Sequence, residues 1–311
     1  MEKVWKIMEK HGVPRRDLYD LPTSKKRFLD KCHYRIEISG VERPSTLEAL
    51  IDEMEKRDVP VHRLISMVMG ATLLSDDEME QFARMAKDAK LEVIVTPGPR
   101  TLWDLGGQVR TAEGALSGIR FRGSDNLAYV IADIKRAIEF GFRGFLVVDE
   151  GLLWLLNEMR KAGDIPKDVV FKVSILAGHA NPAGAKVLEM LGADTFNPVA
   201  DLTLPMLAAI RKAIDIPIDV HVLLFDSFGG FNRIWEAPEI TRITAPCYYK
   251  IEPGVSMGSL YKPWVSPDTL AFIVREKVKT AETIIGIIEK NYPEAKLSKM
   301  GAKDLAIPKG T

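Results

Sequence analysis

The sequence predicts an α/β protein built as a single (β/α)8 barrel, and three observations support this fold class. Between residues 33 and 292, a short apolar run alternates eight times with a longer segment of helical periodicity. No GxGxxG turn follows any of these runs, which disfavours the main alternative, a doubly wound open sheet. The 311 residues are 46% hydrophobic and 28% charged, which is ordinary globular composition and enough chain for one large core.

Strands are expected where apolar, β-branched or aromatic runs stand between turn signals. In chain order these segments are 33–40, 61–70, 91–100, 142–150, 169–181, 193–202, 218–230 and 247–254. Helices are expected in the charged amphipathic segments 45–58, 75–90, 126–141, 151–163, 182–192, 203–215, 237–244 and 266–291. Ser75 and Asn126 offer capping chemistry at helix starts, and Gly141, Gly163 and Gly192 follow helix ends. This repeat is typical of a closed TIM barrel.

The chain divides into three segments. Residues 1–32 form an N-terminal helical extension, whose amphipathic stretch VWKIMEKHG is predicted to plug the bottom of the barrel or to pack on a partner subunit. Residues 33–292 form the barrel, and residues 293–311 are expected to form a loosely ordered C-terminal arm.

Charge and cysteine content limit the classes of partner. Forty-three basic residues balance forty-three acidic ones, so no overall charge favours nucleic acid or an anionic membrane. The charged N-terminus lacks the apolar run of a signal peptide, so we expect a cytoplasmic protein. Cys32 and Cys247 are far apart in the sequence and are expected to be free thiols. The expected partners are a small-molecule substrate and further copies of the chain, without nucleic acid or membrane.

The predicted strand IPIDVHVLLF contains two ionisable residues, Asp219 and His221, which share one face because side chains alternate along a strand. Polar residues occupy the matching positions of other strands: Arg35, Glu37, Ser39, Lys172, Ser174, Thr195, Asn197, Lys250 and Glu252. The residues between them, such as Ile36, Ile175 and Val220, are expected to face the helices. Ordinary barrel interiors hold Val, Ile and Leu, so we expect the polar set to converge inside the barrel, toward the mouth where active sites of this fold lie.

Three interpretations of this polar interior stay open, because buried ions must be paired or coordinated. The first is a structural ion-pair network. The second is a divalent metal, Zn²⁺, Mn²⁺ or Mg²⁺, bound by side chains of Glu37, Asp219, His221 and Glu252, although no contiguous motif such as HExxH is present. The third is metal-free acid/base or Schiff-base chemistry at Lys172 or Lys250.

Loops after the predicted strands supply further candidates. The Gly-rich loops DSFGGFNR and EPGVSMGS suit the binding of an anionic group, with Ser227 and Arg233 as substrate contacts. The loop after the third strand is long enough for a lid, and Arg100 and Arg120 are its candidate contacts. The sequence AGHAN places His179 at the mouth as a candidate acid or base.

The segment from FRGFLVVDE through LGADTFNPVADLTLPMLAAIRKAIDIPIDVHV resembles the barrel domain of peptidase family U32 in its order of strand, turn, GAD-type strand and DLTLPML helix. The sequence departs from that family at DSFGGFNR, which lacks the paired cysteines, while Leu223 and Leu224 stand where a His-Gly pair would fall. The resemblance implies hydrolysis of peptides or related amides. The missing cysteines argue against the iron–sulfur, hydroxylating branch of the family.

We therefore expect an enzyme of hydrolase (peptidase- or amidase-like) or lyase type, acting on a small polar or anionic, amino-acid- or peptide-like substrate. In this hypothesis a metal or Lys250 polarises a carbonyl, and His221 or His179 moves a proton. Substrate contacts are predicted at Arg35, Arg100, Asn197, Ser227 and Arg233. The alternative is a non-catalytic barrel that binds a small ligand or a partner protein.

Overall fold

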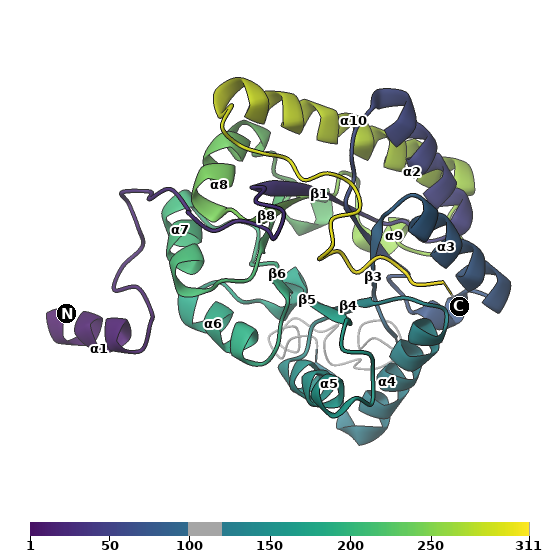
Figure 1. Ribbon diagram of the computed structural model, residues 1–311, viewed down its shortest axis with the longest axis horizontal. Coiled ribbons are helices and arrows are strands. Elements are labelled where there is room, and N and C mark those ends of the chain that lie inside the picture. The colour runs from purple at the N-terminus through teal and green to yellow at the C-terminus, as the bar shows by residue number, and fades with distance from the viewer. Residues whose placement is uncertain (99–119, 311) are drawn as a thin grey trace.

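The computed structural model describes residues 1–98 and 120–310 and confirms the (β/α)8 TIM barrel. The described strands are parallel, each pairs with the next along the chain, and β8 pairs back with β1 to close the sheet (Figure 1). They are β1 (Tyr34–Ser39), β2 (Arg63–Ser66), β3 (Glu92–Val95), β4 (Gly144–Val147), β5 (Val170–Val173), β6 (Thr195–Phe196), β7 (Ile218–Leu223) and β8 (Cys247–Ile251).

Helices surround this sheet in the described part of the chain (Figure 1). They are α1 (Glu2–Lys10), α2 (Pro44–Arg57), α3 (Asp76–Asp88), α4 (Gly123–Glu139), α5 (Glu150–Ala162), α6 (Pro182–Met190), α7 (Leu204–Ala213), α8 (Ala237–Thr244), α9 (Met257–Leu260) and α10 (Pro267–Asn291). Short 3-10 helices are η1 (Ala71–Leu73), η4 (Ile175–Ala177), η5 (Asp226–Phe228) and η6 (Ile234–Glu236). Within residues 1–98 and 120–310, no helix has the length and apolar composition needed to cross a membrane.

Helix starts follow local capping chemistry. Ser75 begins α3 with a reciprocal capping box, in which its Oγ accepts from the backbone N–H of Glu78 and the Glu78 carboxylate accepts from the N–H of Ser75. The predicted start of α4 at Asn126 is wrong, because that side chain donates to the Arg122 carbonyl and the helix begins earlier, at Gly123.

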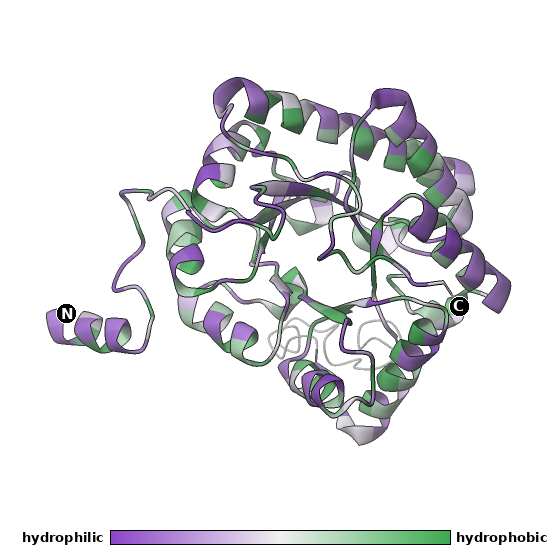
Figure 2. Ribbon diagram, in the orientation of Figure 1, coloured by the Kyte–Doolittle hydropathy of each residue, from purple (hydrophilic) through white to green (hydrophobic). Residues whose placement is uncertain are grey.

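Two apolar clusters lie on opposite sides of the sheet. The larger fills the space between strands and helices, and it contains the residues predicted to face outward: Ile36, Ile38, Val173, Val220, Val222 and Ile251. Figure 2 shows hydrophobic residues on β4 and β5 and hydrophilic residues along the surrounding helices. The smaller cluster, which includes Ile65, Leu146 and Phe225, lies apart from it. Ile175 does not face the helices as predicted, because β5 ends at Val173 and η4 places Ile175 in the wall of a cavity.

The C-terminal segment packs against the barrel and is not a loose arm. Ser298 is buried, and its carbonyl lies 2.8 Å from Nε2 of His62. Further along, the backbone N–H of Ala306 donates to Oε1 of Glu92 at 3.1 Å. The yellow segment in Figure 1 therefore crosses the end of the barrel from which the strands start.

Arg35 belongs to this closed end. Its guanidinium donates to Asp304 at 2.7 Å, to the Ser298 hydroxyl at 2.9 Å and to the Tyr248 hydroxyl at 3.0 Å. The Phe28 ring, from the N-terminal segment, lies 3.8 Å from the guanidinium carbon. Arg35 therefore links the barrel to the two chain ends. Because it lies at the closed end of the barrel, the structure does not favour its predicted role as a substrate contact.

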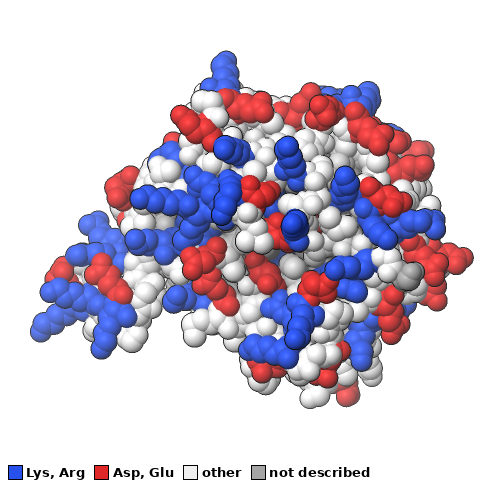
Figure 3. All heavy atoms as spheres, in the orientation of Figure 1, with Lys and Arg blue, Asp and Glu red and all other residues white. Residues whose placement is uncertain are grey.

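The N-terminal helix α1 does not plug the barrel, since none of its residues is buried. It stands away from the barrel in Figure 1, and basic side chains gather on it in Figure 3. Arg15 links it to the following segment, pairing with Glu2 at 2.8 Å and lying 5.0 Å from the centre of the Trp5 ring. Packing of this helix on a partner subunit stays a prediction.

Candidate active site at the barrel mouth

Arg63 is the centre of a buried ion-pair network inside the barrel. It stands in register with Glu37 of β1 and Glu92 of β3, so the three side chains share the inward face. Its Nε donates to Glu92 at 2.6 Å, and its Nη1 lies 3.0 Å from Asp219 and 3.3 Å from Glu37. Burial disfavours the charged guanidinium, but the three carboxylates raise the pKa of Arg63 well above its ordinary value. The arginine therefore stays charged and holds three strands together.

Lys172 is the second cation of this network. Its Nζ lies 3.0 Å from Oε2 of Glu37 and donates to Oδ2 of Asp219, an oxygen that also accepts from the Thr195 hydroxyl at 3.0 Å. Burial lowers the pKa of Lys172, against the opposing effect of its two carboxylate partners. For Asp219, the nearby Lys172 and Arg63 outweigh burial and lower the pKa. Lys172 is thus committed to the interior network, so it does not reach the mouth as a catalytic residue.

The inward-facing set predicted from the sequence lacks Arg63, Glu92 and Tyr248, all of which are buried. The alternation rule would have identified them. Arg63 and Glu92 stand level with Glu37 on the next two strands, and Tyr248 precedes Lys250 by two residues on β8. The Tyr248 ring completes the network by packing 3.5 Å from the guanidinium carbon of Arg63.

Lys250 and Glu252 lie on the mouth side of this network. Lys250 Nζ is 3.4 Å from Oε1 of Glu252 and 3.9 Å from Oε1 of Glu37. Both separations are longer than the 3.0 Å between Lys172 and Glu37. The ammonium group of Lys250 is therefore held in place by charge, but it is not fixed by close hydrogen bonds to these carboxylates.

His221 connects Glu252 to the neighbouring strand. Its Nε2 is 2.8 Å from Oε2 of Glu252, and its Nδ1 is 3.3 Å from the amide nitrogen of Asn197. Because an amide nitrogen only donates, Nδ1 accepts and Nε2 carries the proton directed at Glu252. Burial lowers the pKa of His221, so the imidazole is neutral. Burial opposes ionisation of Glu252 as well, yet Lys250 and His221 hold the pKa of its carboxyl well below its ordinary value.

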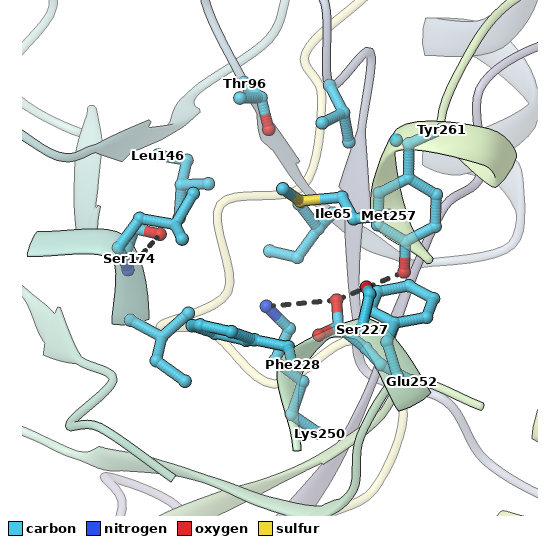
Figure 4. A pocket seen from close by; sticks show the side chains of 15 residues that line it. Ile65, Thr96, Leu146, Ser174, Ser227, Phe228, Lys250, Glu252, Met257 and Tyr261 are labelled. Carbon is cyan, nitrogen blue, oxygen red and sulfur yellow. Dashed lines mark hydrogen bonds and ion pairs between the residues drawn. The ribbon is translucent and has the colours of Figure 1, made fainter. Parts of the chain in front are cut away.

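A cavity of about 190 Å³ opens directly above Lys250. Its polar lining comes from Thr96, Ser174, Ser227, Lys250, Glu252 and Tyr261. The remaining lining is Ile65, Val68, Leu146, Ile175, Leu176, Phe225, Phe228, Met257 and Gly258. Figure 4 shows the Lys250 amine beside Glu252, with the Tyr261 hydroxyl on the other side of that carboxylate. The described cavity is thus a largely apolar pocket with two charged side chains, Lys250 and Glu252, in its lining.

Two buried polar atoms beside the cavity have no hydrogen-bond partner among the described residues. They are Oγ1 of Thr96, which lines the cavity, and Oε1 of Glu37, which lies 3.9 Å from Lys250 Nζ. Buried side-chain oxygens are rarely left unpaired in native proteins, and such atoms commonly mark a place for a bound ligand or water. Their position favours a ligand with a polar group toward the floor of the barrel mouth.

The four predicted metal ligands do not form a cation site in this arrangement. Glu37 and Asp219 accept contacts from Lys172 and Arg63, whose positive charges would repel a metal ion. Across residues 1–98 and 120–310, no group of three or more His, Cys, Asp or Glu side chains is arranged to hold a metal ion. Binding of a divalent metal by these residues therefore stays a prediction, and this arrangement does not favour it.

Of the residues predicted from loops, Ser227 belongs to the described lining of the cavity, while His179 and Arg233 do not. His179 Nε2 lies 2.7 Å from Glu150, which also pairs with Arg120 at 2.9 Å. Arg233 donates to the carbonyls of residues 200 and 202 at 3.1 and 2.8 Å and pairs with Glu236. These contacts join loops to one another. Arg100 lies outside the described residues.

Comparison with known proteins identifies no family for this chain. No protein-family model and no curated protein matches it. Solved structures with a similar arrangement include a U32 peptidase, with 16% identity, a TM-score of 0.41 and coverage of 94% of this chain and 93% of that chain. A D-psicose 3-epimerase from Clostridium cellulolyticum has 11% identity and a TM-score of 0.47, covering 81% of this chain and 99% of that chain. A truncated 3-deoxy-D-arabino-heptulosonate 7-phosphate synthase from Thermotoga maritima has 13% identity and a TM-score of 0.40, covering 86% and 90%. At these identities the likeness concerns the TIM-barrel fold alone, and membership of the U32 family is not shown.

Proposed function

We propose that this protein is an enzyme of the lyase type, which forms an imine between Lys250 and a small aldehyde or ketone at the barrel mouth. The observation that carries the proposal is the position of the Lys250 amine, at the floor of a largely apolar cavity and only loosely held by its two carboxylates. A lysine in such surroundings is suited to act as a nucleophile toward a carbonyl group.

The reaction needs no group beyond the protein and the carbonyl compound. The Lys250 nitrogen loses a proton and attacks the carbonyl carbon, forming a C–N bond. The carbonyl oxygen then leaves as water after taking up two protons, and the product is a protonated imine. In a β-hydroxy substrate this iminium can accept the electron pair of the Cα–Cβ bond. That bond then breaks to give an enamine and a carbonyl fragment. The hydroxyl proton passes to a base such as Glu252, which lines the cavity.

The charge pattern of the site suits this sequence. Lys250 begins as a cation facing the carboxylates of Glu37 and Glu252, and the protonated imine is also a cation at the same nitrogen. The desolvated site therefore keeps its balance of charge, and Glu252 keeps a cation beside it throughout. After cleavage the enamine takes back a proton, and the water released when the imine formed hydrolyses the product imine, which frees Lys250 for the next turnover.

The described walls favour a compound whose carbonyl group is attached to a small, largely apolar remainder. About 190 Å³ of space accommodates a compound of only a few carbon atoms beyond the carbonyl. The anionic substrate expected from the sequence depended on the two Gly-rich loops, on Arg233 and on the long-loop residues Arg100 and Arg120. Arg233 bonds to loop carbonyls and Arg120 pairs with Glu150, so the contacts of these two arginines lend no support to an anion at the cavity.

Hydrolysis of a peptide or amide, the other chemistry expected from the sequence, has less support from this site. Ser174 and Ser227 are the serines of the described lining, and serine is a common hydrolase nucleophile. Ser174 Oγ accepts from the backbone N–H of Leu176, and the described hydrogen bonds give neither serine a histidine partner. An activated serine requires such a base within hydrogen-bond reach.

Reductive trapping tests the proposal. The purified protein is incubated with butanone, butanal or pyruvate and treated with sodium borohydride, which converts an imine into a stable secondary amine. Peptide mass spectrometry then locates the adduct. We expect butanone and butanal to label Lys250 ahead of the exposed lysines, and Lys250→Met to abolish that label.

The remaining lysines of the same protein are the internal control for non-specific modification. Labelling spread over exposed lysines without enrichment at Lys250 would contradict the proposal. Stronger trapping of pyruvate than of butanone would contradict the apolar substrate class and restore an anionic one.

A further inference from the structure

Tyr261 lies beside the proposed imine site, in the loop that follows β8. It directly follows α9, and its side chain is buried, with its ring packed edge-on at 5.2 Å from the Phe225 ring. The ring forms part of the cavity wall. Because the aromatic contact fixes the ring, the hydroxyl has a defined position.

That hydroxyl shares a carboxylate oxygen with Lys250. Tyr261 donates to Oε1 of Glu252 at 3.1 Å, and Lys250 Nζ lies 3.4 Å from the same oxygen (Figure 4). Oε1 of Glu252 therefore bridges the amine and the phenol. Burial raises the pKa of Tyr261 well above its ordinary value, with Glu252 and Glu42 adding to the effect, so the phenol keeps its proton and its hydroxyl is a hydrogen-bond donor.

Lys277 approaches the same hydroxyl from outside the barrel. It belongs to α10, is fully buried, and donates to the Ser39 carbonyl at 2.7 Å. Its Nζ also lies 3.5 Å from the Tyr261 hydroxyl and 5.2 Å from the ring centre. A donor on the phenol oxygen uses that oxygen as an acceptor and leaves the phenol's own proton for Oε1 of Glu252 or for a ligand in the cavity. Lys277 thus orients the hydroxyl without itself lining the described cavity.

We propose that Tyr261 is a catalytic proton-transfer residue of the Lys250 site and that Lys277 is its positioning residue. This inference rests on the proposed imine chemistry. Conversion of a protonated lysine and a carbonyl into a protonated imine and water moves two protons from the nitrogen to the departing oxygen. In each of the two steps, carbinolamine formation and loss of water, Tyr261 gives a proton to that oxygen. Each time it regains one that the Lys250 nitrogen releases through Oε1 of Glu252, which contacts both groups.

The test measures the rate and the extent of imine formation separately. Samples of the full-length protein with butanone are quenched with borohydride at successive times, and the Lys250 adduct is counted by mass spectrometry. We expect Tyr261→Phe, which keeps the ring packing, to reach the same final extent but on the order of 100-fold more slowly. An unchanged rate in Tyr261→Phe would overturn this inference while leaving the imine proposal standing, whereas absence of the adduct from the unaltered protein would overturn the imine proposal itself.

A second pair of variants tests the positioning role. Lys277→Met is expected to lower the imine rate at saturating butanone while leaving the half-saturating concentration unchanged. If this variant fails to fold by thermal denaturation, Lys277→Gln, which retains a donor for the Ser39 carbonyl, is measured in its place. Lys279→Met is the control on the same helix, since its side chain is 55% exposed. Equal rates in the Lys277 and Lys279 variants, or a change in half-saturation alone, would contradict the positioning role.

Discussion

Lys250 and Glu252 stand two residues apart and place Nζ and Oε1 3.4 Å from each other at the barrel mouth. Lys172, deeper in the barrel, is held by two carboxylates, with one contact to Glu37 at 3.0 Å. Lys172 and Lys250, two buried lysines on neighbouring parts of the barrel interior, thus have different surroundings. One balances interior charge, and the other presents an amine to the cavity.

This difference predicts different outcomes for matched substitutions. Lys172→Met leaves Arg63 as the one close cation shared by Asp219 and Glu37. This variant is therefore expected to lower the free energy of unfolding by about 3–5 kcal/mol. Lys250→Met, at the wall of the cavity, is expected to cost on the order of 1 kcal/mol and to abolish imine trapping. Urea unfolding of both variants checks the prediction, and equal destabilisation would show that the two lysines share one structural role.

Asp219 is expected to be structural, which favours the first of the three interpretations left open by the sequence, the ion-pair network. If Asp219 instead carried chemistry, Asp219→Asn would be expected to keep or raise the melting temperature. In the structure Asp219 contacts Lys172, Arg63 and Thr195. Replacing its charge therefore leaves two buried cations underpaired, and we expect a loss of about 3–5 kcal/mol. Thermal and urea denaturation measure this, and a melting temperature at or above that of the parent would favour a chemical role for Asp219 instead.

His62 predicts a defined pH dependence of stability. Its Nδ1 accepts from the backbone N–H of Ile36 and its Nε2 donates to the Ser298 carbonyl, so both nitrogens are used by the neutral ring. Burial lowers the pKa of His62 from 6.5 to about 4. Between these pH values the unfolded chain binds the proton and the folded chain does not. The contribution of the neutral His62 ring to the free energy of unfolding is therefore complete above pH 6.5 and is lost as the pH falls toward 4.

The measurement is urea unfolding at pH 7 and pH 4.5. We expect the loss of stability between these pH values to be smaller in His62→Asn by about 2–3 kcal/mol than in the parent. His11→Asn, at an exposed position after α1, serves as the control and is expected to match the parent. An unchanged pH dependence in His62→Asn would contradict the prediction.

The fold could be predicted from the sequence because alternation and helical periodicity are local signals. The position of each inward-facing residue along the barrel axis could not be predicted in the same way. Alternation tells which face of a strand a side chain occupies, but not whether it lies near the closed end or near the mouth. Arg35 is the second residue of β1 and lies at the closed end, whereas Lys250 is the next-to-last residue of β8 and reaches the mouth. Counting back from the carboxyl end of each strand would have separated the two groups.

Closure of the barrel by the chain ends could not be predicted either. The contact between His62 and Ser298 joins residues 236 positions apart in the sequence. Such a contact has no local pattern, and the segment after residue 293 is polar and turn-rich. Lys277 illustrates the same limit, because a charged residue on a long amphipathic helix reads as solvent-exposed until the packing of α10 places it beside Tyr261.

Gly40, at the end of β1, provides a final prediction that links the strand to Tyr261. Its φ of 78° lies in the left-handed region, and a Cβ at this position would lie 2.2 Å from Cε1 of Tyr261. Gly163, after α5, has a similar φ of 86° with open space around the same position. Alanine at either site carries the cost of the backbone conformation, about 1 kcal/mol, but only at Gly40 must an aromatic ring move.

We therefore expect Gly40→Ala to lower the free energy of unfolding by about 1–3 kcal/mol more than Gly163→Ala, since a side chain forced into a packed site costs that much. Displacement of the Tyr261 ring should also separate its hydroxyl from Oε1 of Glu252, so imine formation should slow in Gly40→Ala and keep the parent's rate in Gly163→Ala. Urea unfolding and time-resolved borohydride trapping measure the two effects on the same preparations. If both alanine variants were equally destabilised and equally fast, the close contact between Gly40 and Tyr261 would have no part in holding the hydroxyl at the site.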